Sequence, residues 1–132
     1  MPFGVATVVT SVGKGVASKR MVGVTPTQAE PKFVAMGTGA TTAARTAAVG
    51  DTALSTEVET RAAGTSSNVT TTVTNDTYQV VGTITATASR AVDEGGMFDA
   101  STVGNMFTSA TFNVVNLATN DSLQFTWKVQ FA

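Results

Sequence analysis

The chain has 132 residues, enough for one domain, and it contains neither cysteine nor histidine. These absences exclude disulfides, thiolate zinc sites, cysteine nucleophiles and Ser-His-Asp triads. Only 13% of the residues are charged and the net charge is −1, so the whole chain offers no general attraction to nucleic acid or to an anionic membrane. We therefore expect no enzyme, no metal or cofactor, and no nucleic-acid or membrane partner.

The first 31 residues differ in composition from the rest. They hold all three prolines (Pro2, Pro26 and Pro31), and glycines recur through them. Lys14, Lys19, Arg20 and Lys32 are four of the eight basic residues, and Glu30 is the one acid among the first 32 residues. Because such a segment cannot bury much of itself, we expect an extended N-terminal arm over residues 1–31 that becomes ordered against another surface, followed by a domain over residues 32–132.

The arm carries apolar and basic side chains that suit contact with another protein. Charge at such a contact adds orientation more than affinity. The residues expected to bind a partner are Phe3, Val5, Val8, Val9, Lys14, Lys19, Arg20 and Met21.

From residue 32 onward the pattern indicates β structure. A short apolar strand is expected over residues 32–36, followed by a surface loop over 40–55 with about one helical turn in it. The β-branched content of residues 57–63, 68–74 and 77–88 predicts three further strands.

The last strand has the clearest pattern. Leu123, Phe125, Trp127, Val129 and Phe131 alternate with polar or charged residues, which predicts that these five side chains share one buried face. Burial of five such groups would contribute roughly 7–15 kcal/mol before the entropy of ordering is subtracted.

Two similar segments break the β-rich runs: residues 74–77 contain Asn75-Asp76, and residues 119–122 contain Asn120-Asp121. Asn and Asp tolerate a positive φ, so each pair suits a tight turn. This predicts two hairpins, one pairing 68–74 with 77–88 and one pairing 110–117 with 122–131. The fold class that follows is an all-β antiparallel sandwich, jelly-roll-like, with an extended N-terminal arm.

The carboxylates fall into two loose groups, which comprise Asp51, Glu57 and Glu59, and Asp93, Glu94 and Asp99. Neither group has calcium-loop spacing, and few aromatic residues are left to line a glycosidase cleft. We interpret both groups as solvated loop charges. The glycine pairs at 13–15 and 37–39 do not complete a phosphate-binding motif.

Three segments together resemble a known family. Residues 31–39 (PKFVAMGTG), 51–57 (DTALSTE) and 92–100 (VDEGGMFDA) are similar to sequences of small virion proteins of tailed bacteriophages. The last segment also makes physical sense as a strand that buries Phe98, with Asp99 capping the turn at 100–104. The resemblance implies a structural role in the particle and brings no catalytic residues.

The expected function is therefore that of a capsid decoration (cement) protein. It would bind the major capsid protein on the exterior of the head, after synthesis in the host cytoplasm, and form a homo-oligomer, with a trimer favoured over a dimer. A tail, baseplate or fibre component is one alternative. A receptor- or carbohydrate-binding module is another, and would need an exposed aromatic platform. Tyr78 and Trp127 are the large candidates for it, and Trp127 is assigned to the core by its alternation.

Overall fold

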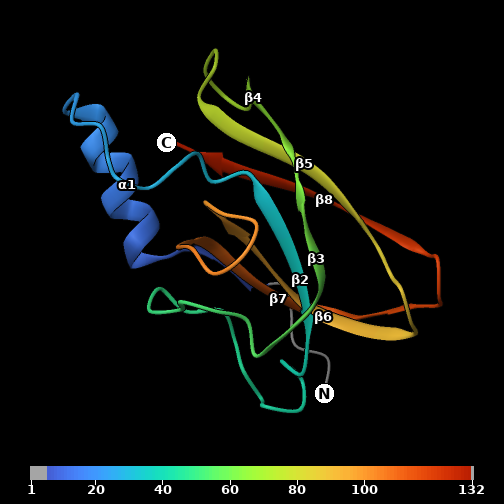
Figure 1. Ribbon diagram of the computed structural model, residues 1–132. Coiled ribbons are helices and arrows are strands. Elements are labelled where there is room, and N and C mark those ends of the chain that lie inside the picture. The colour runs from blue at the N-terminus through green and yellow to red at the C-terminus, as the bar shows by residue number, and fades with distance from the viewer. Residues whose placement is uncertain (1–5, 132) are drawn as a thin grey trace.

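The computed structural model describes residues 6–131, which form eight strands and one helix (Figure 1). The elements are β1 (Ala6–Val9), α1 (Ser11–Met21), β2 (Phe33–Thr38), β3 (Thr56–Ala63), β4 (Thr65–Val69), β5 (Thr77–Thr85), β6 (Arg90–Phe98), β7 (Met106–Leu117) and β8 (Ser122–Gln130).

The strands make two antiparallel sheets. The larger has the order β1-β7-β6-β2-β3, and the smaller has the order β4-β5-β8. A shared core joins them, since Val34 and Met97 of the larger sheet pack in one cluster with Val80 and Trp127 of the smaller. The expected β class and antiparallel pairing are confirmed, whereas a jelly-roll connectivity stays a prediction.

Most of the expected strands are present. The predictions over residues 32–36, 57–63 and 77–88 correspond to β2, β3 and β5. The segment 40–55 contains no strand and begins with a turn at 40–44, as expected. Phe98 is buried at the end of β6, and Asp99 accepts hydrogen bonds from the backbone and side chain of Asn105 across the following turn.

The alternation of the last strand is confirmed up to its end. Leu123, Phe125 and Val129 are partly buried against the core, and Trp127 is 7% exposed. Phe131, however, is 56% exposed, so its assignment to the core is wrong. β8 ends at Gln130, and a period of two applies only while the chain stays in the strand.

One of the two predicted hairpins forms, but with a longer connection than expected. The strand predicted over 68–74 is wrong for residues 70–74, because β4 ends at Val69, which pairs with Thr77. β4 pairs with β5, and Asn75 in the connection has a φ of 59°. The second prediction is wrong, because β8 pairs with β5 and not with β7. Asn120 does turn the chain with a φ of 72°, but the turn leads from one sheet to the other and exchanges backbone hydrogen bonds with Ala86. Alternation indicates which face of a strand is buried but not which strand it pairs with. β7 and β8 belong to different sheets, and their buried faces meet the core from opposite sides.

The N-terminal segment is also more regular than expected. The expected extended conformation is wrong for residues 11–21, which form α1. Residues 6–9 are extended as β1 but pair with β7 of the same chain, and residues 22–32 contain no helix or strand. Thr10 caps α1 by accepting from the Gly13 backbone N–H at 3.1 Å, and its hydroxyl donates to the Met106 carbonyl at 2.5 Å. A Cβ at Gly13 would lie 2.4 Å from the Phe107 carbonyl oxygen, so this glycine allows α1 to approach β7 closely.

Candidate interaction surface

The structure separates the expected partner-binding residues into two groups. Val8 and Val9 lie half-buried in β1, where they pair with Ser109 and Thr108 of β7. Lys14, Lys19, Arg20 and Met21 are exposed on α1. Phe3 and Val5 lie outside the described residues. Four of the eight positions therefore share one helix.

An open groove runs beside α1, between the helix and the end of the smaller sheet. We call it the α1 groove. Figure 1 shows α1 beside the arrowhead of β8, where the chain ends. The groove measures about 640 Å³ and most of its wall is apolar. Its lining residues are Val16, Ala17, Arg20, Met21, Glu30, Pro31, Asn68, Tyr78, Phe107 and Phe131.

Large apolar side chains mark the mouth of this groove. Met21 is 76% exposed and Phe131 is 56% exposed, although both are large apolar groups. Val22 and Val24 continue the exposed apolar surface beyond the helix. A cluster of exposed apolar side chains on a folded domain is typical of a surface that contacts another macromolecule.

Hydrogen bonds fix the polar wall of the groove. The Tyr78 hydroxyl donates to the Pro31 carbonyl at 3.2 Å and lies 3.5 Å from Glu30 Oε1, which also accepts from the Ser66 hydroxyl. The hydrogen bond from Ser66 is the main cause that lowers the pKa of Glu30. Burial, with the nearby charge of Glu30, raises the pKa of Tyr78 well above its ordinary value. At neutral pH this wall therefore presents a fixed carboxylate and a neutral phenol.

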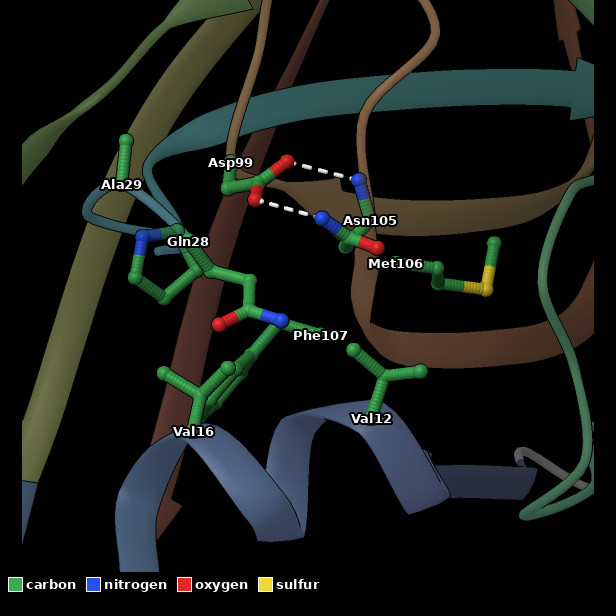
Figure 2. Close-up of a pocket in the computed structure, with 9 residues that line it drawn as sticks. Val12, Val16, Gln28, Ala29, Asp99, Asn105, Met106 and Phe107 are labelled. Atoms are coloured by element: carbon green, nitrogen blue, oxygen red, sulfur yellow. Dashed lines mark hydrogen bonds between the residues drawn. The ribbon is translucent and has the colours of Figure 1, made fainter. Parts of the chain in front are cut away.

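The face of α1 that meets β7, next to the groove, is closely packed. Figure 2 shows Val12 and Val16 directed from the helix toward Phe107, with the Asp99–Asn105 pair nearby. The cavity left between these groups is about 10 Å³, room for about one water molecule. This contact attaches the helix to β7, and the α1 groove is the side that stays open.

The carboxylates considered in the sequence serve to hold loops. Asp93 and Glu94 are buried in β6, and Glu57 and Glu59 belong to β3, so the interpretation as solvated loop charges is wrong for these four residues. Asp93 accepts the backbone N–H groups of Ala40 and Thr41 at 3.1 and 2.7 Å, and Glu94 Oε1 accepts that of Thr56 at 3.0 Å. Asp93 therefore bonds the start of the 39–55 loop to β6, and Glu94 bonds β6 to the first residue of β3, where this loop ends.

Arg45 supplies the positive charge beneath this loop. Its Nη2 donates to Asp51 Oδ2 at 3.0 Å, and its Nη1 lies 3.7 Å from Glu94 Oε2. Ser109 also donates to Asp51, at 2.6 Å. Elsewhere Glu57 pairs with Arg61, and Glu59 pairs with Arg90, whose hydrogen bond lowers the pKa of Glu59. Each of these carboxylates is paired with an arginine that holds it in the fold, and they do not form an acid–base dyad.

Of the ten residues that line the groove, two, Arg20 and Met21, were among the expected partner-binding residues. Glu30, Tyr78 and Phe131 come from three distant segments. Tyr78 carried a signal as a candidate for an aromatic platform, and Phe131 as the last position of the alternating pattern. Trp127, the other candidate for an aromatic platform, is in the core as expected.

Comparisons with protein families, with curated proteins and with solved structures find no match to this chain. Within the described residues, no helix has both the length and the apolar character needed to cross a membrane.

Proposed function

We propose that the protein is a structural component of a bacteriophage particle, and specifically a capsid decoration protein on the exterior of the head. The phage assignment rests on the three sequence segments that resemble small virion proteins. The observation that supports an assembly role is the α1 groove, where Met21 and Phe131 are exposed on a chain with few charges. Together these features favour a protein that acts by binding a larger surface.

The mechanism is mechanical. An apolar side chain of the major capsid protein fills the α1 groove and covers Met21 and Phe131, which removes apolar surface from water at about 25 cal/mol per Å². Lys19 and Arg20, at the last turn of α1, orient the contact toward an acidic patch. Each contact is modest, but many copies on one shell, or several in one oligomer, raise the overall affinity through effective concentration.

The proposal includes self-association and the virion as the site of action. A tail, baseplate or fibre component is the alternative within the same class, and the number of copies per particle distinguishes it from a shell protein. A glycan-binding module has less support, because Trp127 is buried and the Tyr78 hydroxyl is bonded to the Pro31 carbonyl.

The test uses particles that lack the protein, to which purified full-length chain is added back. We expect the wild type to bind, and the double variant Met21→Glu/Phe131→Glu to lose binding, because each substitution places a charge in the apolar mouth of the groove. Val114→Glu is the matched control, since Val114 is an exposed valine of β7 outside the groove. Bound protein is quantified against the major capsid protein by mass spectrometry. Equal binding of the groove variant and the wild type would overturn the proposal.

A further inference from the structure

A cleft of about 590 Å³ lies between the two sheets, on the side where the chain does not join them. On the other side β3 continues into β4 after Gly64 alone, so one stretch of chain links the larger sheet to the smaller (Figure 1). At the cleft the edge strands are β1 and β8, and among the described strands β1 pairs with β7 alone and β8 with β5 alone. We call this opening the β8 cleft, and its lining residues are Thr7, Ala110, Phe112, Phe125, Thr126, Trp127 and Lys128.

The cleft meets the edge of β8 and not one of its faces. Residues 125–128 line it consecutively, although alternate residues of a strand point to opposite faces. Edge strands are usually protected by being short, bulged or charged, and the other edges follow this rule. β1 has four residues and β4 has five, while β3 has a break in its register with β2 and three charged side chains. β8 has nine residues in unbroken register with β5, no proline and one charge, so its free edge is open to pairing.

Two side chains of the cleft lack a polar partner. Trp127 is 7% exposed, yet its indole Nε1 has no hydrogen-bond acceptor among the described residues, and buried donors are nearly always bonded. The exposed Lys128 ammonium has no carboxylate within 4 Å in the part of the chain that the structure describes. Between them, Phe125 lies with its ring centroid 6.2 Å from that of Phe112 and 6.5 Å from that of Trp127. An occupant that suits this wall therefore supplies apolar side chains, a hydrogen-bond acceptor and an acidic group.

The walls of the cleft also decide the shape of the occupant. Thr7 and Ala110 of the larger sheet stand beside the β8 edge, so a second folded copy that paired through its own β8 would place its larger sheet in the same space. A single extended segment needs only the width of one strand, about 4.8 Å from β8. It also presents backbone N–H and C=O groups along its whole length, which is how extended peptides add to an exposed sheet edge.

We propose that the β8 cleft binds an extended segment of another protein, which adds a strand beside β8. Apolar residues of the segment face the rings of Phe112, Phe125 and Trp127 on the core side, and the residues between them lie on the outer side with Lys128. One of these outer residues is acidic and pairs with Lys128, and a carbonyl of the segment accepts from Trp127 Nε1. This surface shares no lining residue with the α1 groove and does not depend on where the protein acts.

The test uses the full chain and a synthetic seven-residue peptide, TVEVTVT, blocked at both ends. Trp127 is the single tryptophan, so its fluorescence and its one indole N–H resonance report directly on the cleft. We expect the peptide to shift the fluorescence saturably and to move the indole N–H resonance downfield as the new hydrogen bond forms. An analogue with methylated backbone nitrogens has no N–H groups to pair with β8 and should not bind.

Charge reversal tests the stated chemistry of the segment. Lys128→Glu should weaken binding of TVEVTVT about tenfold and strengthen binding of TVKVTVT by a similar factor. Lys14→Glu is the matched control, because Lys14 is an exposed lysine of α1 outside the cleft, and it should bind like the wild type. Circular dichroism should show both variants folded. The proposal would be overturned by unchanged Trp127 signals at millimolar TVEVTVT, by equal binding of the methylated analogue, or by equal effects of the two substitutions.

Discussion

Arg45→Met tests whether the charged cluster beneath the 39–55 loop holds that loop on the larger sheet. The Glu94 side chain is 0% exposed. The Arg45 side chain is 18% exposed, and its Nη1 lies 3.7 Å from Glu94 Oε2. Arg45 also pairs with Asp51 at 3.0 Å. Methionine keeps much of the aliphatic length but leaves both carboxylates without this cation. Breaking a buried ion pair costs about 3–5 kcal/mol, and the partial exposure of Arg45 places the expected loss of unfolding free energy near the lower value, about 3 kcal/mol.

The assay is thermal and urea unfolding of the variant beside the wild type. In a domain of this size a loss of about 3 kcal/mol corresponds to a fall in Tm of roughly 10–15 °C. Adding Glu94→Gln should restore part of the loss, because the neutral amide no longer needs a cation. A coupling energy of about 1–2 kcal/mol is expected in the double-mutant cycle. Lys32→Met is the control, since Lys32 and Glu30 form a largely exposed pair at 3.5 Å that contributes at most about 1 kcal/mol.

Two results would refute this reasoning. One is a loss in Arg45→Met no larger than that in Lys32→Met. The other is strict additivity of Arg45→Met and Glu94→Gln, which would mean that the two groups do not interact and that the loop is held by other contacts.

Three further predictions concern local features. The pKa of Asp76 is lowered by the backbone N–H groups of Val73, Thr71 and Thr72, so its stabilising effect is present above the unfolded-state pKa and is lost as pH falls through the folded-state value. Asp76→Asn should therefore have a lower Tm than the wild type at pH 7, and the difference in Tm should narrow in acid. A difference in Tm that does not change with pH would contradict this. Gly82→Ala should lower the free energy of unfolding in urea by about 1–3 kcal/mol, because its Cβ would lie 1.9 Å from Val34 Cγ2. Gly15→Ala should raise it by up to about 1 kcal/mol, because a Cβ there meets nothing within 4 Å. Equal effects of the two substitutions would refute the packing argument. Thr10→Ala should lose about 1–2 kcal/mol and accelerate amide hydrogen exchange in α1, and unchanged exchange there would show that the cap does not hold the helix.

The sequence predicted the faces of strands better than their partners. The alternation from Leu123 to Val129 correctly identified which side chains meet the core, because a period of two is a local property of an extended chain. The pairing of β8 with β5 depends on which sheet the chain enters after Asn120, and packing across the core decides it. The same limit applies to Asp93 and Glu94, which are buried in β6 and bond to residues at the start and just after the end of the 39–55 loop.

The N-terminal helix could not be predicted from local propensity. Its eleven residues include Gly13 and Gly15, which disfavour a helix in isolation. The contacts that stabilise α1 come from distant segments. The carbonyls of Met106 and Phe107 in β7 accept hydrogen bonds from Thr10, the Val49 carbonyl accepts from Ser11, and Val16 is buried against the core. The α1 groove has the same origin, because its lining joins six regions that no sequence motif connects: α1, the 30–31 segment, β4, β5, β7 and Phe131.

The copy number of this protein in purified phage particles tests the central proposal most directly. Quantitative mass spectrometry, calibrated against the major capsid protein, gives that number without any assumption about the contact surface. A decoration protein of the head should be present in an amount comparable with the capsid subunit. A handful of copies per particle would place the chain in the tail or baseplate, and its absence from particles whose genome encodes it would contradict a structural role altogether.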